Sequence, residues 1–512
     1  MSSTNLKVLA LALLTILFNY FFWEEKVGIN LPLFSSLLIG SLIYSDKIKL
    51  DSLAIKVALG LTIFTGILVV IHNSVISVFT HFFSFIVLVG FLHRPQLTSV
   101  SSAMFQFGVN ALMSTFEPII LLASTNNHRN RNTSKFNWVF RITKLLIIPV
   151  VVFFIFLSIF KAANPIFSNM LDTTFSGFFQ AFNQFFYSLS LPHLIFILFG
   201  AFIIICVLKN WERAKGIHKL FQFQSPKILQ SPENLNETNA KNEYKTALIL
   251  ICSVNVLLLI INIIDIRFIW FNVGGDLKSA VELSQLVHNG TYLLIFSILL
   301  SIAILLFYFR KDLNFLSDNK WLITASYIWI IQNGILVISV LLRNYEYIIN
   351  YGLTHKRIGV FFFLLLTSAG LVLMWLKIKK LYSFLHLFKQ AGWVFYIAFI
   401  SLAIFDWDSM IARYNLSTQS AANIDYKYLY DLSNRTLPIL YENKEKIIER
   451  IKQKPAMDHE KEINKLNNKI KRYLSEQQGY TWVSWDLSNS KAVDYFKDKK
   501  LEDYTPPVTK NQ

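Results

Sequence analysis

The chain is short of the residues that keep a protein surface soluble. Only 16% of its 512 residues are charged, against about 25% in an average soluble protein, and 54% are hydrophobic. Its 12 prolines and 18 glycines are too few for a fibrous or low-complexity protein. Its two cysteines, Cys206 and Cys252, lie in apolar stretches, which excludes a disulfide framework and a thiolate metal site. The composition therefore predicts a membrane protein.

Catalytic and nucleotide-binding motifs are also lacking. The sequence contains no HExxH, no Walker loop, no GxSxG and no GxGxxG in a suitable context. It has neither zinc-finger spacing nor a basic-aromatic pattern for RNA binding. We therefore expect no cofactor, no metal site and no nucleic-acid partner, and whether the protein is an enzyme stays open.

Long apolar stretches are present in number. A helix needs about 20 apolar residues to span a bilayer. The first stretch carries no cleavage pattern, so we interpret it as an uncleaved anchor. The sequence predicts an all-α polytopic membrane protein with about eleven spans, which are Val8–Trp23, Ile29–Tyr44, Leu53–Ile71, Val75–Leu92, Ile142–Phe160, Leu191–Leu208, Tyr244–Ile264, Tyr292–Phe309, Trp321–Leu342, Ile358–Leu376 and Phe384–Phe405.

The distribution of charge predicts the orientation. Of the 49 Lys and Arg and 32 Asp and Glu, 31 and 16 respectively precede Asp406, so the basic surplus belongs to the membrane part. With a cytoplasmic N-terminus in a bacterial inner membrane, every large basic cluster falls on the cytoplasmic side and the C-terminus is periplasmic. The exception is the segment Arg343–Arg357, where Arg343, Lys356 and Arg357 lie on the predicted outer side.

Three segments do not fit simple spans. Ala103–Ala123 is apolar but is interrupted by polar residues and a proline, so we expect it to be re-entrant or interfacial; if it spanned, the orientation of the tail would reverse. Residues 166–190 carry phenylalanines at helical spacing, which predicts an amphipathic helix at the outer interface. Residues 209–243 are polar and predict a cytoplasmic loop.

The composition changes after Phe405, where charges of both signs replace the apolar runs. Residues 1–405 are therefore predicted as the transmembrane domain and 406–512 as a small, mainly helical, extramembrane domain. One predicted helix carries Leu437, Leu440, Ile447, Ile448 and Ile451, and a second carries Ile463, Leu466, Ile470 and Leu474, forming a hairpin around Pro455. Asp406 and Asp408 flank Trp407, which we interpret as an interfacial anchor.

Charged and amide side chains inside the predicted spans form a candidate site. Such groups are costly in a bilayer and usually face a cavity or another helix. Helical spacing places several of them at the outer ends of neighbouring spans, with Glu282 and His288 in the loop between. The candidate cluster is Asn262, Asp265, Glu282, His288, Asn333, Arg343 and Arg357. Pairs such as Asp265–Arg343 or Glu282–Arg357 would fasten helices together, and the alternative is a functional pocket.

Several stretches resemble a family of bacterial multi-pass membrane proteins catalogued as a domain of unknown function. The resemblance covers roughly Ala163 to Leu440. It is carried by Asn262 with Asp265, His288-Asn289-Gly290-Thr291-Tyr292, Gln332-Asn333 with Arg343, Tyr351-Gly352-Leu353-Thr354 with Arg357, Ile411-Ala412-Arg413-Tyr414-Asn415, and Asp425-Tyr426 with Tyr428-Leu429. The resemblance implies the multi-pass architecture and no activity.

Three functions remain compatible with the sequence. The favoured one is a sensor, scaffold or envelope-associated module whose outer C-terminal domain binds a protein partner, because that domain is distinct and no catalytic set is complete. The polar spans favour a transporter or lipid-handling protein, and the outer cluster favours a membrane enzyme acting on a lipid-linked or envelope substrate. The predicted environment of all three is the lipid bilayer.

Overall fold

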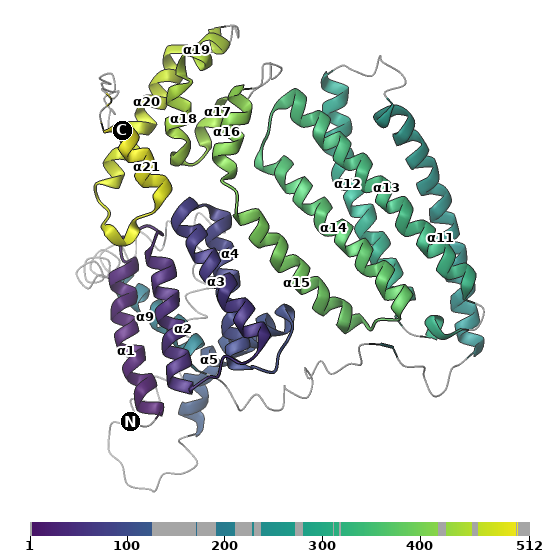
Figure 1. Ribbon diagram of the computed structural model, residues 1–512, viewed down its shortest axis with the longest axis horizontal. Helices are drawn as coiled ribbons and strands as arrows, with labels where there is room; N and C mark the ends of the chain where they lie inside the picture. Colours follow the sequence, from purple (N-terminus) through teal and green to yellow (C-terminus); the bar gives the residue numbers. More distant parts are fainter. Residues whose placement is uncertain are drawn as a thin grey trace. The chain divides into compact units, whose positions relative to one another are not determined.

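The computed structural model describes residues 3–124, 191–209, 237–271, 280–310, 312–316, 319–417, 426–452 and 459–497, with Met170, Ile228, Leu229 and Lys499 as single positions. Every named element in these ranges is a helix (Figure 1), which confirms the predicted all-helical class. Within the described ranges, six helices are long and apolar enough to cross a membrane, so the chain is a membrane protein. They cover Leu53–His72, Val75–His93, Thr238–Trp270, Lys320–Tyr351, His355–Lys380 and Phe384–Ala403.

Those six helices coincide with six of the eleven predicted spans. Three further predicted spans correspond to shorter apolar helices, Leu9–Phe22, Pro192–Leu208 and Tyr292–Tyr308, and a fourth to the 17-residue helix α2, Asn30–Asp46. Ile142–Phe160 and nearly all of 166–190 lie outside the described residues. The count of eleven therefore stays a prediction.

The chain divides into two compact units, Met1–Trp23 with Val109–Asn210 and Glu24–Gly108 with Trp211–Gln512. In the first unit, α1 (Ser3–Phe22) packs against α9 (Leu191–Leu208). The Phe18 ring stacks on Phe196 at a centroid distance of 4.8 Å and lies against Gly200, where a Cβ atom would be 2.1 Å from the ring. Small residues of this kind let two membrane helices approach closely.

The second unit begins with α2 and the tight hairpin of α3 (Leu53–His72) and α4 (Val75–His93). Asn73 ends α3 in the left-handed region, with φ 45°. Ser74 then caps α4, because its hydroxyl accepts from the Ser77 amide while the Ser77 hydroxyl accepts from the Ser74 amide. Only two residues therefore separate α3 from α4. The next helix, α5 (Val100–Ser124), is continuous through the segment Ala103–Ala123, whose place in the membrane stays a prediction.

Four long helices form the central bundle of the second unit: α11 (Glu237–Asp265), α12 (Ala280–Tyr308), α13 (Lys320–Tyr351) and α14 (His355–Lys380). Their inward-facing side chains make one hydrophobic core that includes Ile251, Ile298, Trp329 and Leu364. A five-residue π-helix, η3 (Ile266–Trp270), continues α11, and a 3-10 turn, η4 (Asp312–Phe315), precedes α13. Helix α15 (Phe384–Ala403) packs against α14, α3 and α4.

Two helices of this bundle begin before the predicted spans, for the same reason. Helix α11 already begins at Glu237, inside the predicted loop 209–243, and α12 begins at Ala280, before the predicted span. Hydropathy marks where a helix is apolar, whereas the hydrogen-bonded helix continues through polar residues outside the apolar part.

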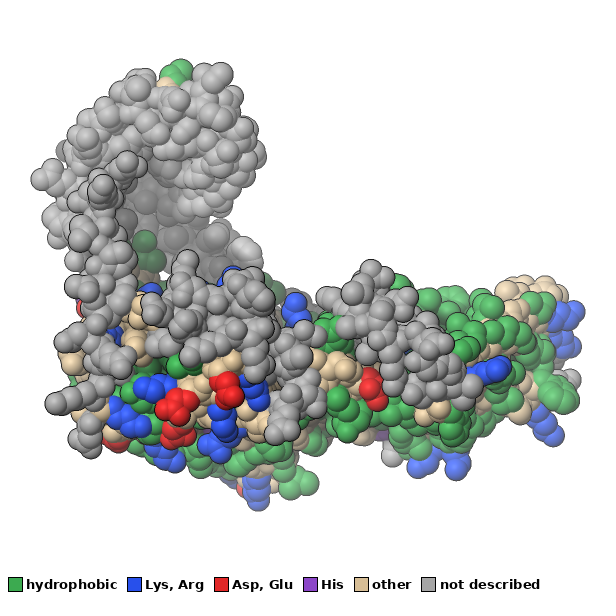
Figure 2. All heavy atoms as spheres, turned by 90° about the horizontal axis from the view of Figure 1, so that it is seen from above, with side chains coloured by type: hydrophobic (Ala, Val, Ile, Leu, Met, Phe, Trp, Pro, Cys, Tyr) green, Lys and Arg blue, Asp and Glu red, His purple; other side chains and the backbone are tan. Residues whose placement is uncertain are grey.

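Short helices follow α15, and we call α16–α21 the C-terminal module. They are α16 (Trp407–Ser417), α17 (Tyr426–Asp431), η5 (Asn434–Thr436), α18 (Leu437–Glu442), α19 (Lys444–Lys452), α20 (His459–Gln477), η6 (Trp482–Ser484) and α21 (Leu487–Phe496). They share a hydrophobic core built around Ile411, Leu440, Ile470 and Tyr473. Side chains of both charge signs gather over these helices, whereas hydrophobic side chains dominate over α11–α14 (Figure 2).

The predicted helical hairpin is present in part, because α19 contacts α20. The single helix predicted over Leu437–Ile451 is wrong. It is divided into α18 and α19 at Asn443, whose amide group and backbone N–H both bond the Ile439 carbonyl. A polar side chain that satisfies the backbone locally competes with the helix and stops it, although the apolar spacing continues.

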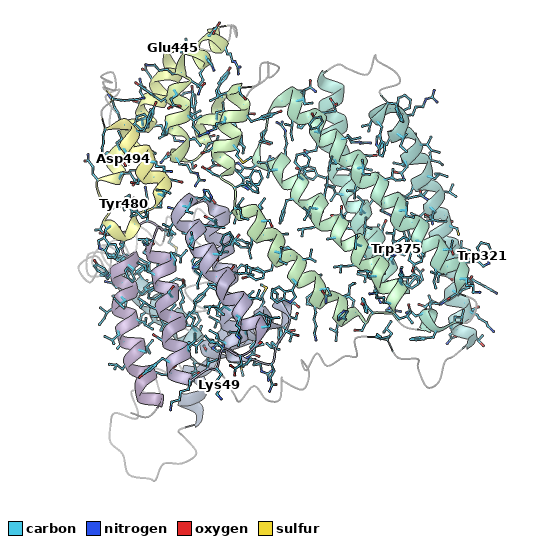
Figure 3. The ribbon with its side chains drawn as sticks, in the orientation of Figure 1. Lys49, Trp321, Trp375, Glu445, Tyr480 and Asp494 are labelled. Carbon is cyan, nitrogen blue, oxygen red and sulfur yellow. The ribbon has the colours of Figure 1, made fainter. Side chains whose placement is uncertain are left out.

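Hydrogen bonds from backbone and side-chain groups fasten the C-terminal module to the segment before α2 and to the end of α3. The Ile29 amide donates to the Trp485 carbonyl at 2.9 Å, and Asn73 Nδ2 donates to Asp486 Oδ2 at 2.8 Å. The Ser488 hydroxyl donates to the Ile71 carbonyl at 2.6 Å. Tyr480 and Asp494 accordingly lie at the end of these helices opposite to Lys49 (Figure 3).

Gly28 permits this close approach. A Cβ atom on Gly28 would lie 2.5 Å from the Ser484 carbonyl group and 2.7 Å from the Trp485 carbonyl oxygen. We expect Gly28→Ala to destabilise the protein by about 1–3 kcal/mol, because the crowded atoms belong to the backbone and cannot rotate away. Thermal unfolding in detergent measures the loss. The matched control is Gly40→Ala within α2, where a Cβ atom meets nothing within 4 Å. Equal stability of the two variants would contradict the proposed clash.

Candidate functional site

The predicted pair of Asp265 and Arg343 is present. Asp265 ends α11, and Arg343 lies in the last third of α13. Arg343 Nη2 donates to Asp265 Oδ1 at 2.5 Å, and the side chains are only 13% and 4% exposed. Such a charge-assisted bond compensates two ions that are removed from water. It joins α11 to α13.

Arg357 has different partners. Its guanidinium donates to the carbonyls of Tyr351 and Gly352 and lies 4.3 Å from the centre of the Tyr347 ring. The Tyr351 and Gly352 carbonyls are at the C-terminal end of α13, where a cation complements the helix dipole. Arg357 therefore caps α13 and adds a cation–π contact.

Amide side chains continue the polar contact between α11 and α13. Asn262 Nδ2 donates to the Gln332 carbonyl at 3.1 Å, and Gln332 Nε2 donates to Asn255 Oδ1 at 3.0 Å. Asn333 is fully buried, and its amide donates to the Trp329 carbonyl of its own helix. Glu282 and His288 lie on α12 rather than in a loop, and their side chains are outside the described residues.

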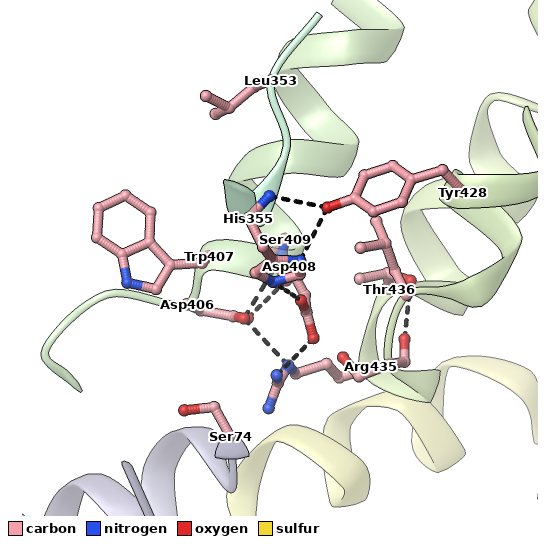
Figure 4. A network of polar contacts seen from close by, with 12 residues as sticks. Ser74, Leu353, His355, Asp406, Trp407, Asp408, Ser409, Tyr428, Arg435 and Thr436 are labelled. Carbon is pink, nitrogen blue, oxygen red and sulfur yellow. Dashed lines mark hydrogen bonds and ion pairs between the residues drawn. The ribbon is translucent and has the colours of Figure 1, made fainter. Parts of the chain in front are cut away.

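A second group of charges lies where the C-terminal module meets the membrane helices (Figure 4). Arg435 in η5 pairs with two carboxylates: its Nε lies 3.0 Å from Asp406 Oδ1, and its Nη2 lies 2.7 Å from Asp408 Oδ2. Its Nη1 donates to the His72 carbonyl at the end of α3. The Arg435 side chain is only 9% exposed.

Two more side chains extend this group from α14 and α17. His355 Nε2 lies 2.7 Å from Asp408 Oδ1, and His355 Nδ1 lies 2.8 Å from the Tyr428 hydroxyl oxygen. The backbone amide of His355 also donates to that hydroxyl at 2.9 Å. We call Asp406, Asp408, Arg435, His355 and Tyr428 the charged node, because they join α3, α14, α16, α17 and η5.

Local structure explains where the two carboxylates point. Asp406 directly precedes α16, and its carboxylate accepts from the Ser409 hydroxyl at 2.6 Å and from the Ser409 amide at 3.4 Å. It therefore caps the helix, as acidic residues at helix N-termini do. Asp408 follows in the first turn of α16. The sequence interpretation treated Asp406 and Asp408 only as neighbours of a tryptophan anchor. It missed the helix cap and the ion pairs with Arg435, although the Asp-Trp-Asp spacing at a helix start was a usable signal.

The charges of the node shift its pKa values. Burial by itself raises the pKa of Asp408, but hydrogen bonding from His355 and the charge of Arg435 outweigh it and hold the pKa well below the ordinary carboxyl range. Burial and the Asp408 carboxylate raise the pKa of Tyr428. The tyrosine–histidine–aspartate chain resembles the geometry that activates a nucleophile. A raised tyrosine pKa opposes activation, so these contacts are better suited to holding the module.

The lowered pKa of Asp408 makes stability depend on pH. Because folding favours the ionised carboxylate, the contribution of Asp408 to the free energy of unfolding is fully present above the unfolded pKa of about 4. That contribution is lost as the pH falls below this value. We expect the melting temperature in detergent to fall more steeply between about pH 5 and pH 3 in the wild type than in Asp408→Asn. Parallel pH profiles of the two proteins would refute the prediction.

Two segments that carry the family resemblance meet beside the node. Asn415 Oδ1 accepts from the Leu353 amide at 2.6 Å, and Asn415 Nδ2 donates to the Leu353 carbonyl at 2.9 Å. The preceding Gly352 has φ +79°, and a Cβ atom there would lie 2.4 Å from Asn415 Oδ1. Both its backbone angle and this close approach require glycine. The Tyr351–Thr354 and Ile411–Asn415 segments thus bind each other through one asparagine.

Comparison with known proteins identifies the family. A family model described as "Domain of unknown function (DUF4153)" matches residues 58–443. The match runs from α3 to Asn443 and includes every residue of the charged node as well as Asp265 and Arg343. No curated protein and no solved structure matches the chain. Because the family model covers more than half of the chain, this membrane protein belongs to the DUF4153 family.

Proposed function

We propose that this protein is an inner-membrane sensor or scaffold of the bacterial envelope, whose C-terminal module faces the periplasm and is coupled to the membrane helices through the charged node. The observation that carries the proposal is the set of contacts made by the buried Arg435 side chain of the module. It pairs with the carboxylates of Asp406 and Asp408 at the start of α16, and it donates to the His72 carbonyl at the end of α3. A partner that moves the module would have to strain or break these bonds.

The coupling reaches the central bundle through His355. His355 is the first residue of α14, and its ring bonds Asp408 on one side and Tyr428 on the other. Asn415 holds the turn before α14 in the same way. A displacement of α16 or α17 would therefore act directly on the start of α14, which is what a sensor requires.

The arrangement of charge supports a periplasmic module. The module bonds one end of each of these helices, and basic residues gather at the other end. They are Lys47 and Lys49 after α2, Arg94 after α4, and Lys379 and Lys380 at the end of α14. Three basic residues conflict with this orientation: Arg343 is occupied by Asp265, Arg357 is occupied by helix carbonyls, and Lys356 stays exposed. Arginines bound within the helices weigh less in orientation than free basic residues in loops.

Labelling from outside the cell tests the orientation. In a Cys206→Ala, Cys252→Ser background, we expect Lys446→Cys in the exposed part of α19 to react with a membrane-impermeant maleimide in cells with a permeabilised outer membrane. Lys49→Cys should react only after the inner membrane is broken. Protection of Lys446→Cys in those cells would refute a periplasmic module.

Distance measurement tests the coupling. Spin labels at Glu346→Cys on α13 and Lys427→Cys on α17 should give a narrow pulsed-EPR distance distribution in the full chain. His355→Ala should broaden or shift it, because Asp408 and Tyr428 each lose a bond to α14. The matched control, Lys356→Ala, alters the next, exposed residue of the same turn and should change nothing. An unchanged distribution in His355→Ala would refute the coupling.

A transporter is the second candidate, favoured by the polar contact between α11 and α13. Four buried oxygens there have no hydrogen-bond partner among the described residues: Asn262 Oδ1, Asp265 Oδ2, Gln332 Oε1 and Asn333 Oδ1. Oxygens of this kind inside a membrane suit water or a cation. Sodium uptake into proteoliposomes that is lost in Gln332→Leu would favour this candidate, and equal uptake by protein-free liposomes would exclude it.

A further inference from the structure

A pocket of about 470 Å³ opens on the module beside the charged node. One face of α16, one face of α21 and the start of α18 form its walls, and the last turn of α3 closes one end. Its apolar lining includes Ile71, Met410 and Ile439, and its charged lining includes Arg413 and Lys491. The pocket is therefore amphipathic.

The pocket carries two uncompensated positive charges. Arg413 and Lys491 are exposed, and neither has a hydrogen bond or an ion pair among the described residues. Arg435 and Asp406 also line the pocket, but they bind each other. The lining thus offers two free cations, which attract an anion and can bond its oxygens.

A buried hydroxyl in the same lining also lacks a partner. Tyr495 lines the pocket from α21, and its hydroxyl is buried with no hydrogen bond among the described residues. A buried polar atom without a partner is costly, so such groups in native proteins usually bind something. The hydroxyl is not exposed to the pocket as it stands, so a ligand oxygen would supply the missing bond after the Tyr495 side chain turns toward the pocket.

Two helices that are apolar enough to cross a membrane, α3 and α15, end beside the pocket. α3 ends at His72 and α15 ends at Ala403, close in sequence to the lining residues Ile71 and Asp406. Ile71 lies on the same face of α3 as Gly60, Phe64 and Ile67, which follow one another at helical spacing. These three residues are exposed and form an apolar stripe that leads to Ile71. An acyl chain can lie along this stripe while its headgroup reaches the pocket.

We propose that this pocket binds the phosphate of an anionic phospholipid headgroup, with Arg413 and Lys491 holding the charge and Tyr495 donating a hydrogen bond. The acyl chain lies on the exposed stripe of α3. This inference goes beyond the proposed sensor or scaffold function and does not depend on it, since a lipid can bind here whichever partner the module has.

Lipid titration of the purified full-length protein tests the site. Dioleoylphosphatidylglycerol added in detergent should raise the melting temperature to a plateau, and zwitterionic dioleoylphosphatidylcholine should not. Arg413→Gln with Lys491→Gln should raise the half-saturating phosphatidylglycerol concentration roughly 30-fold, on the basis of the usual worth of two basic residues near a membrane surface. Both side chains are exposed, so the melting temperature without lipid should stay unchanged.

A matched variant and two further measurements make the test decisive. Lys427→Gln with Lys446→Gln removes the same charge from exposed positions of the module outside the pocket and should respond like the wild type. Tyr495→Phe should weaken phosphatidylglycerol binding roughly fivefold while leaving lipid-free stability intact. Equal lipid responses of the pocket variant and the Lys427/Lys446 variant would overturn the site. Full stabilisation by inorganic phosphate alone would overturn the lipid and leave a soluble phosphate as the ligand.

Discussion

Replacing Arg435 by glutamine is expected to cost about 3–5 kcal/mol of stability, because it leaves two carboxylates beside each other without their cation. Asp406 and Asp408 both contact the guanidinium, at 3.0 and 2.7 Å, and the His72 carbonyl loses a donor as well. The Asp408 side chain is 10% exposed, so water compensates little. Chemical or thermal unfolding in detergent, with limited proteolysis of the module, measures the effect.

Two variants separate the charge from the shape of the bond. Arg435→Lys keeps the charge but lacks the planar guanidinium fork that contacts two carboxylates and a carbonyl at once. It should therefore recover only part of the stability lost in Arg435→Gln. Arg413→Gln, on the neighbouring surface of the same module, removes an exposed arginine and should fall within about 0.5 kcal/mol of the wild type. A stable, protease-resistant Arg435→Gln would refute the structural role of the node.

The sequence predicts contacts between long helices better than contacts made by short ones. Asp265 and Arg343 were paired from spacing alone, because a bilayer makes an unpaired charge costly and helical geometry fixes which face each residue occupies. The six predicted spans that coincide with long apolar helices follow from the same physics, since twenty consecutive apolar residues leave few alternatives.

The charged node was not predicted because its residues come from short elements with no periodic pattern. Arg435 is in a three-residue turn, 27 positions after Asp408, and His355 is 53 positions before it. Periodicity cannot report contacts of that kind, since they depend on how the module folds back on α3 and α14. Arg357 shows the converse: the sequence offered Glu282 as its partner, whose side chain lies outside the described residues, whereas the nearest backbone carbonyls at the end of α13 accept its hydrogen bonds.

The ion pair of Asp265 and Arg343 yields the second large effect. Asp265→Asn and Arg343→Gln should each lose about 3–5 kcal/mol, because each leaves a buried ion without its partner. The double variant should recover much of that loss, with a coupling energy of about 2 kcal/mol or more. The three variants and the wild type form a double-mutant cycle, measured by unfolding of the full chain in detergent.

The cycle also distinguishes a structural pair from a ligand site. If Arg343 served an anionic ligand, Arg343→Gln would leave the empty protein stable, and Asp265→Asn would not compensate for it. The distance of 2.5 Å and the low exposure of both side chains favour the structural pair. Intact stability in both single variants, with no coupling in the double variant, would show that the pair does not hold α11 to α13. The unpartnered second oxygen of Asp265 would then be the first atom to examine for a bound cation, with sodium titration of the wild type and Asp265→Asn as the measurement.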